Sequence, residues 1–257
     1  MADPVAVARR GDVAWCTLDR PPLNLLDPEL IAAVHAAFEG LTADPTIRAA
    51  VLTGSGRAFT AGMNVHVLHD LDVTRAKVLI TSLHAMIASV HHAPFPVIGR
   101  VNGFCLGAGF ELALACDVRI AATAARLGLP EVRVGVPSVI EAALLPGLVG
   151  PGRAAEMLLT GEAVDAEQAQ AWGLVNRAVP MDELDAAVTE VVDKILACGP
   201  AAIRLQKELM VRWRYTDLAS AIEHGIDAFA SAYATGEPQE GARAFLEKRA
   251  PRFGKAF

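Results

Sequence analysis

"PVIGRVNGFCLGAGFELALACDVRIA", residues 96–121, contains one glutamate, Glu111, within an almost unbroken run of small and apolar side chains. Residues 97–101 have the composition of a buried strand, the Asn-Gly pair after them predicts a turn, and a helix is expected from about Leu106. The positions three and four residues away from Glu111 are all glycine, alanine or leucine. The carboxylate therefore has no polar helix face that leads to bulk water.

The burial of Glu111 has two interpretations. Removing a lone carboxylate from water is costly or raises its pKa, and a general acid or base benefits from a raised pKa. The first interpretation is therefore catalytic. In the second, Glu111 reaches a helix end or a subunit edge and forms an ion pair with an arginine. The physics of the sequence leaves both open.

Three glycines, Gly103, Gly107 and Gly109, lie at the junction between the predicted strand and helix. Glycine allows another group to approach the backbone closely, and the first N–H groups of a helix have no intrahelical acceptor. A developing oxyanion can be stabilised at such a helix start. The pattern predicts an oxyanion-binding turn that is followed, in the same helix, by a buried acid.

Two other segments have a similar character. The stretch "SGRAFTAGMNV" (55–65) follows a predicted buried strand, and a turn at Gly62 would expose the N–H of Met63. In "LGLPEVRVGVPS" (127–138), Pro130 restricts the backbone just before Glu131, which again lies among leucine, valine and glycine.

The composition restricts the class of protein. The 257-residue chain is 53% hydrophobic and 20% charged, which suits one large domain, with or without a small appendage. A net charge of −6 argues against a general surface for nucleic acid or anionic membrane. Four cysteines are scattered without C-x-x-C spacing, as in a reducing compartment, and the N-terminal residues do not resemble a signal peptide. We expect a soluble, cytoplasmic protein without nucleic-acid or membrane partners.

Strands and helices alternate in the first half of the chain. Strands are expected at 12–18, 47–54, 95–101 and 117–123. Asp27 and Pro28 predict the start of a helix that ends near Gly40, and a long amphipathic helix is expected over 74–92. Residues 78–99 lack Asp, Glu, Lys and Arg, but their histidines and prolines favour a helix, a turn and a strand over a membrane span. After residue 123 the periodicity is mostly helical. We predict an α/β core over 1–200 and a helical C-terminal region over 201–257.

These motifs, in this order, closely resemble the enoyl-CoA hydratase/isomerase (crotonase) superfamily over nearly the whole chain. The matching stretches are "RPPLNLLDPEL" (20–30), "GRAFTAGMNV" (56–65), residues 96–121 and 127–138, "LLTGEAVDAEQAQAWGLVNRAVP" (158–180) and "AFLEKRAPRF" (244–253). The resemblance implies a spiral of β-β-α turns with a helical C-terminal trimerisation region, assembled as a trimer or a dimer of trimers. It also implies a coenzyme A thioester as the substrate, with no separate cofactor.

The resemblance also implies roles for individual residues. The backbone N–H groups of Met63 and Ala108 would form an oxyanion hole for the thioester carbonyl, and Glu111 and Glu131 would occupy the two catalytic glutamate positions. The residues expected to contact the substrate are Ala61, Gly62, Asn64, Val65, Gly107, Pro130 and Ser138. The implied reaction is the addition of water across the 2,3 double bond of a 2-enoyl-CoA.

The chain departs from the family pattern at several positions. Asn64 replaces a usual aspartate, Met63 replaces a small residue, and Ala108 replaces a common glycine. The largest departure is "VPSVIEAALL" (136–145), where hydratases carry a glycine-rich loop that opens a helix over the acyl group.

Two questions follow from this loop. Val139 and Ile140 either narrow the acyl pocket or face the core. Glu141 is either a third carboxylate near the pocket or a first-turn acid that interacts with the helix dipole.

Other activities remain open on the same scaffold. An enoyl-CoA isomerase often needs one glutamate, so the presence of Glu111 and Glu131 favours hydration over isomerisation; an acyl-CoA hydrolase is a further alternative. A non-catalytic acyl-CoA-binding protein is disfavoured because two buried acids without a role would be costly.

Sites of other kinds have little support in the sequence. His66 and His69 have no accompanying acid or thiol cluster that would indicate a metal, and neither a G-x-S-x-G nor a G-x-G-x-x-G motif supports a serine hydrolase or a dinucleotide site. Arg57, Lys248 and Arg249 are either contacts for coenzyme A phosphates or solvated surface charges.

Overall fold

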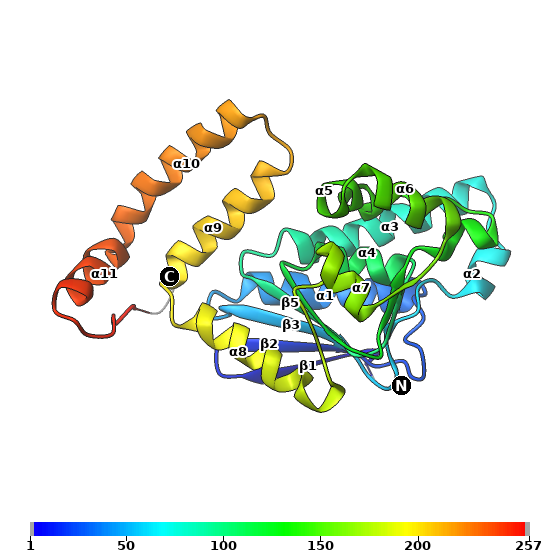
Figure 1. The fold of residues 1–257 in the computed structure, drawn as a ribbon, viewed down its shortest axis with the longest axis horizontal. Coiled ribbons are helices and arrows are strands. Elements are labelled where there is room, and N and C mark those ends of the chain that lie inside the picture. The colour runs from blue at the N-terminus through cyan, green and yellow to red at the C-terminus, as the bar shows by residue number, and fades with distance from the viewer. Residues whose placement is uncertain (1–2, 255–257) are drawn as a thin grey trace.

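The computed structural model describes residues 3–254, which form two β-sheets surrounded by helices and a helical extension toward the C-terminus (Figure 1). The larger sheet has the spatial order β1-β2-β3-β5-β7-β10. β1 and β2 are antiparallel, and the other neighbouring strands are parallel. The strands are β1 (Val5–Arg10), β2 (Val13–Leu18), β3 (Ala49–Gly54), β5 (Val97–Val101), β7 (Val118–Ala122) and β10 (Arg177–Val179).

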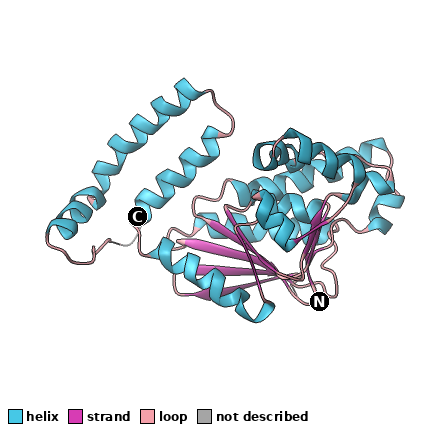
Figure 2. Ribbon diagram, viewed as in Figure 1, coloured by secondary structure: helices cyan, strands magenta, loops and turns pink. Residues whose placement is uncertain are grey.

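The smaller sheet alternates with the larger one along the chain. Its order is β4-β6-β8-β9, and β4, β6 and β8 are parallel. Its strands are β4 (Ala58–Thr60), β6 (Phe104–Leu106), β8 (Arg126–Gly128) and β9 (Val164–Asp165). Three times in succession the chain passes through a strand of the larger sheet, a strand of the smaller sheet and a helical segment (Figure 2). This repeated turn confirms the predicted α/β spiral.

Helix α1 (Pro28–Ala43) begins where the sequence predicts and ends later. The Asp27 side chain accepts a hydrogen bond from the N–H of Leu30 at 2.8 Å, and Pro28 occupies the first turn. The helix continues beyond Gly40 because Leu41 is still buried in the main core. Packing of one more apolar residue outweighs the poor helix propensity of a single glycine.

Helix α4 (Ala108–Ala115) occupies the centre of the molecule. All eight of its residues are buried, and it packs against β6, α3 (Val73–His91) and the 3-10 helix η2 (Glu141–Leu144). A helix that is apolar on every side belongs inside a core, and the small side chains of α4 allow its neighbours to pack closely. It begins two residues after the expected start, at a position that determines the geometry described below.

Helix α3 is long and apolar enough, by length and composition alone, to cross a membrane, and it is the one such helix in residues 3–254. It packs against both α1 and α4, and it buries Leu83, Met86 and Val90 in the main core. Helices in the core of a soluble protein can be equally long and apolar. The place of α3 inside the fold therefore explains its composition.

The chain differs from the sequence predictions at its beginning, in the strands of the smaller sheet and after residue 123. β1 was not predicted, since only Val5 among its residues is buried and the strand has no alternating pattern. The other strands that were not predicted are β4, β6, β8, β9 and β10, because strands of two or three residues are too short to show a period. The remaining helices of this part are α5 (Leu145–Val149), α6 (Pro151–Thr160), α7 (Ala166–Trp172) and α8 (Leu184–Leu196).

Helices α9 (Pro200–Trp213), α10 (Leu218–Ala232) and α11 (Glu237–Leu246) extend away from the sheets, and we call them the arm (Figure 1). Its apolar side chains face solvent in the single chain. No residue of α10 is buried, and the exposed apolar residues of the arm include Trp213, Leu218, Ile222, Ile226, Phe229, Tyr233, Phe245 and Leu246. Exposed apolar faces of this size are typical of protein–protein contact surfaces.

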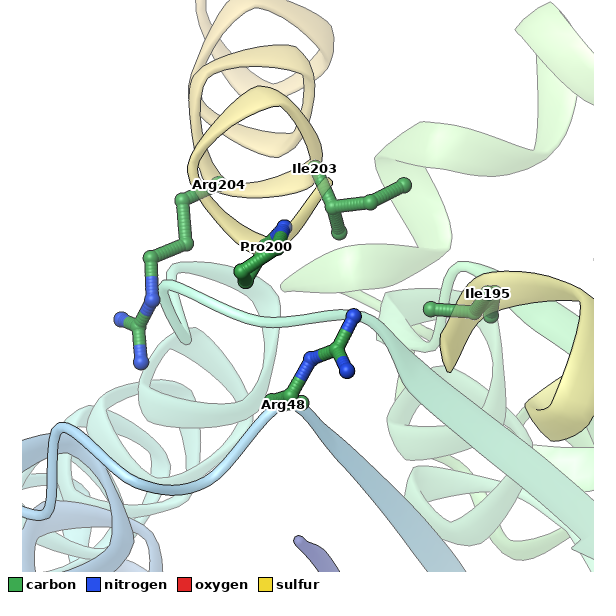
Figure 3. A pocket seen from close by; sticks show the side chains of 5 residues that line it. All are labelled: Arg48, Ile195, Pro200, Ile203 and Arg204. Atoms are coloured by element: carbon green, nitrogen blue, oxygen red, sulfur yellow. The ribbon is translucent and has the colours of Figure 1, made fainter. Parts of the chain in front are cut away.

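Two arginines hold the base of the arm against the body (Figure 3). Arg48, just before β3, donates hydrogen bonds to the carbonyls of Leu196 and Cys198 at 2.9 and 2.8 Å, where α8 ends. Arg204, on α9, donates to the carbonyl of Ile47 at 2.9 Å. Charged donors on main-chain acceptors make these the stronger kind of hydrogen bond, so the arm leaves the body in a defined direction.

Candidate active site

Three segments that follow the parallel strands of the smaller sheet converge on one place. Residues 61–64 follow β4, Gly107 and Ala108 follow β6, and Pro130 and Glu131 follow β8. Because the carboxyl ends of parallel strands lie at one edge of a sheet, consecutive turns of the spiral deliver these segments to the same edge. The three motifs identified in the sequence are thus brought together by topology.

Two glycines allow the segments to approach each other. Gly62 has a φ of +89°, and a Cβ atom at this position would lie 2.8 Å from the carbonyl oxygen of Leu106. Gly107 has a φ of +56°, and a Cβ atom there would lie 2.8 Å from Oε1 of Glu131. A side chain at either position would therefore be both strained and obstructed.

The N–H groups of Met63 and Ala108 are available to a ligand. Met63 lies in an isolated bridge with Leu26, in which the flanking Gly62 carbonyl and Asn64 N–H form the hydrogen bonds, at 2.9 and 2.8 Å. Ala108 is the first residue of α4, where an N–H has no intrahelical acceptor. Within residues 3–254, neither N–H donates to a protein acceptor.

A cavity of about 590 Å³ opens at this edge of the sheet, which is a size typical of small-molecule sites. Nine of the predicted site residues line it: Ala61, Gly62, Met63, Val65, Gly107, Ala108, Glu111, Pro130 and Glu131. The other two lie beside it. Asn64 caps α2 (Val65–His69) by accepting a hydrogen bond from the N–H of His66, and Ser138 contacts Glu131.

The opposite part of the lining is an apolar wall that the sequence analysis did not predict. It comes from α2, α3 and the segment after β8, and consists of Leu68, Leu71, Leu79, Ile80, Leu83, Val134, Val136 and Val139. The period of α3 contains a signal for it, since Leu79, Ile80 and Leu83 recur at helical spacing. That spacing predicts a buried face, however, and does not distinguish a core face from a cavity wall.

Glu131 is held at the start of α4. It belongs to the 3-10 helix η1 (Pro130–Val134) and is partly buried. Its Oε1 atom lies over Gly107, and its Oε2 atom accepts a hydrogen bond from the Ser138 hydroxyl at 2.7 Å. The carboxylate is therefore oriented next to the free N–H of Ala108.

Glu111 is almost completely buried, with 3% of its surface exposed. Burial, reinforced by the charges of Glu131 and Glu141, raises its pKa from 4.5 to about 7, and the N–H groups of Ala142 and Glu141 oppose that rise. Its Oε2 atom has no hydrogen-bond partner in residues 3–254, and no arginine or lysine there forms an ion pair with it. An ion pair within the described chain therefore does not account for the burial of Glu111.

In the segment that replaces the glycine-rich loop, one residue faces the cavity and the next faces the core. Val139 lines the cavity, whereas Ile140 packs against the main core. Glu141 is the first residue of η2, but its carboxylate lies 2.7 Å from Nδ1 of His84 on α3. It is thus both a first-turn acid and a partly buried partner of a histidine.

The secondary candidates do not form sites of their own. Within residues 3–254, no group of three or more His, Cys, Asp or Glu side chains could hold a metal ion, and His69 instead contacts Asp70. Arg249 forms ion pairs with Glu240 and Glu247 inside the arm. Its charge is already satisfied within the chain.

Comparison with known proteins decides the family. The model of the enoyl-CoA hydratase/isomerase family matches residues 8–256. The chain belongs to the enoyl-CoA hydratase/isomerase family.

It is 36% identical to a crotonyl-CoA hydratase of Syntrophomonas wolfei over 97% of each chain. Among solved structures, it resembles an enoyl-CoA hydratase of Bacillus anthracis (TM-score 0.94, 32% identity, 99% and 100% of the two chains). It also resembles an enoyl-CoA hydratase of Mycobacterium smegmatis (TM-score 0.94, 34% identity, 97% and 98%). The family and these relatives indicate a hydro-lyase of the hydratase type.

Proposed function

We propose that the protein adds water across the 2,3 double bond of a 2-enoyl-CoA thioester. The observation that carries the proposal is that two carboxyl groups, those of Glu111 and Glu131, line the same cavity as Met63 and Ala108, whose N–H groups are free. The thioester carbonyl would accept hydrogen bonds from both N–H groups. Its β-carbon would then lie toward the two carboxyls.

The chemistry follows from this arrangement. The oxygen of a water held between Glu111 and Glu131 attacks Cβ, and one carboxylate takes the proton that the water releases. The π electrons of the double bond move toward the thioester, and the negative charge develops on its oxygen, at the N–H groups of Met63 and Ala108. The other carboxyl gives its proton to Cα, which completes the 3-hydroxyacyl product. A proton transfer between the two carboxyls restores the starting state.

The pKa of Glu111 supports a role in proton transfer. A group whose pKa lies near the working pH is present in both proton states and can give or take a proton with little penalty. Burial raises the pKa of Glu111 to about 7, so both proton states of this carboxyl are present near neutral pH. The reaction requires no cofactor, because coenzyme A enters as part of the substrate, and we assign it to the cytoplasm, where the buried thiols would remain reduced.

We also propose that the arm assembles the protein into a homotrimer or a dimer of trimers. Its exposed apolar face supports this, since a folded chain rarely leaves so many large apolar side chains in water. In this proposal the chain divides into a core over 1–200 and an oligomerisation region over 201–257. Light scattering at micromolar concentration should report three or six chains, and a stable monomer would contradict the proposal.

The test of the activity is a panel of 2-enoyl-CoA esters, in which hydration is followed as loss of enoyl absorbance. A 3-enoyl-CoA substrate tests for isomerisation, and release of free coenzyme A tests for hydrolysis. We expect rapid loss of the enoyl band with at least one ester. Binding of the esters without turnover, or turnover only in the isomerase or hydrolase assay, would reject the proposed function.

A further inference from the structure

A third carboxyl group lies next to Glu111, outside the cavity lining. Glu141 is on η2, which packs against α4, the helix that carries Glu111. The side chain of Glu141 is 11% exposed, and its Oε2 atom, like that of Glu111, is buried without a hydrogen-bond partner in the described chain. Two adjacent elements thus each bury a carboxylate oxygen that lacks a partner, and unpaired buried polar atoms are rare enough to require an explanation.

His84 links Glu141 to the surface. Its Nδ1 atom lies 2.7 Å from Oε1 of Glu141, and its side chain is 56% exposed. The other titratable groups that act on Glu141 and Glu111 are His92, at the end of α3, and Glu131. Burial raises the pKa of Glu141, and the two histidines oppose this rise. The order from inside to outside is therefore Glu111, Glu141, His84 and solvent.

We infer that Glu141, held by His84, is a positioning residue that adjusts the proton state of Glu111. Burial and the charge of Glu131 act more strongly on the same carboxyl. This inference rests on the proposed function, in which Glu111 exchanges a proton with the substrate or with water. Two carboxylates in one poorly hydrated region do not ionise independently, so the charge of Glu141 favours a proton on Glu111. His84 favours the ionised form of Glu141 and thereby acts on Glu111 through it. Neither residue lines the cavity, so both act without touching the substrate.

The experiment measures the proton state of Glu111 directly, without turnover. Infrared difference spectroscopy over a pH series follows the protonated carboxyl band, and Glu111→Gln identifies the contribution of Glu111 by removing it. In the wild type we expect a midpoint near 7. Glu141→Gln removes the neighbouring charge, so the midpoint should fall, and the ratio of ionised to protonated Glu111 at pH 7 should rise about threefold.

Two further variants separate the coupling from a structural effect. His84→Gln should shift the midpoint in the same direction, because Glu141 then holds its own proton more strongly and repels Glu111 less. The double variant should match Glu141→Gln alone, because His84 acts only through Glu141. Glu141→Asp retains the charge and should retain most of the wild-type midpoint. The control is His35→Gln, which removes a histidine paired with Glu39 at 3.4 Å on α1 and should change nothing.

The same variants are then assayed with crotonyl-CoA. We expect the pH profile of kcat to move with the infrared midpoint while KM stays constant. An unchanged midpoint in Glu141→Gln and His84→Gln, or an equal shift in His35→Gln, overturns the inference. A shifted midpoint in a protein that hydrates no ester supports the inference and rejects the proposed function. If the protein hydrates an ester but the midpoint of Glu111 is unchanged in the variants, the proposed function is supported and the inference is rejected. The failure of the inference and the failure of the proposed function are therefore distinguishable.

Discussion

Residues 107–115 and residues 130–141 contribute to the same cavity, but they are held in opposite ways. Every residue from 107 to 115 is buried, whereas no residue from 130 to 141 is. The first segment is fixed by packing on all sides, so a group on it keeps its position. The second lies at the surface and is held by side-chain hydrogen bonds, such as those from Ser138 to Glu131 and from Arg133 to the carbonyl of Thr160. The comparison teaches that the two proposed acid–base groups are held differently, since Glu111 is fixed by packing and Glu131 by a hydrogen bond from Ser138 on a more exposed segment.

The largest effect should come from removing either carboxyl. Glu111→Gln and Glu131→Gln should each lower kcat/KM for the best ester by roughly 10² to 10⁴, since general acid–base catalysis contributes about that much. Hydration rates and circular dichroism provide the measurement, with the exposed Glu39→Gln as a control. If only one variant lost activity, the two segments would not share the chemistry, and a one-glutamate reaction such as isomerisation would fit better.

The second prediction concerns stability and follows from the burial of Glu111. Because its pKa is raised in the folded state, the folded chain binds more protons than the unfolded chain between pH 4.5 and about 7. Stability should therefore fall as the pH rises through that window, by up to about 3 kcal/mol from this group. Urea unfolding at pH 5 and pH 8 should show that Glu111→Gln loses this part of the pH dependence. An identical pH dependence in the wild type and the variant would show that the acid is not desolvated.

The third prediction compares one glycine from each segment. Gly107 and Gly135 both have positive φ. Alanine should cost about 1 kcal/mol of stability at Gly135, which is in the left-handed helical region, and more at Gly107, whose ψ of −134° lies outside that region. Only at Gly107 would the new Cβ press on the carboxylate of Glu131, which we propose to be catalytic, since nothing lies within 4 Å of a Cβ at Gly135. We expect Gly107→Ala to lose about tenfold or more in kcat/KM, by displacing Glu131. Gly135→Ala should keep its activity. Similar kinetics for the two variants would remove the distinction between the segments.

Helices and strands that are long enough to show a repeating pattern of apolar residues were predicted from the sequence. Elements too short to show such a pattern were missed. β3, β5, α1 and α3 were expected because their apolar residues repeat over several positions. β8 and β9 were missed because strands of two or three residues lie below the length at which alternation is visible. Tertiary packing, which the sequence pattern does not contain, decides these elements.

The same limit applies to the site. Glu111, Glu131 and the two N–H donors were recognised from local motifs and a family resemblance, and the structure brings them to one cavity. The contact between His84 and Glu141 could not be predicted, because it joins residues 57 positions apart on two different elements. Its sequence signal is only that an acid and a histidine both lie on otherwise apolar segments.

The smallest effect should concern the choice of substrate. Val139 belongs to the segment that replaces the glycine-rich loop and lines the cavity, so we expect the wild type to favour short or specialised acyl groups. Val139→Gly should raise kcat/KM for long relative to short esters, by less than the roughly tenfold that one methylene contributes in a closed pocket, because Val139 is 44% exposed. The assay compares esters from crotonyl-CoA to hexadecenoyl-CoA. Ile140→Val is the matched control, since Ile140 packs on the core. A wild-type rate constant that holds steady or rises with chain length would contradict the restricted pocket.

The alternation of the two sheets has a consequence for how this chain tolerates insertions. Each turn of the spiral contains a strand of three residues in the smaller sheet, and the site groups of Met63, Ala108 and Glu131 follow those strands within a few positions. An inserted residue inside β4, β6 or β8 would reverse the faces of the strand and carry the following group away from its neighbours. An insertion in the long connections between turns would leave the edge of the sheet intact. Length variation among relatives should therefore accumulate between the turns, while the distances inside each strand and its following loop stay constant.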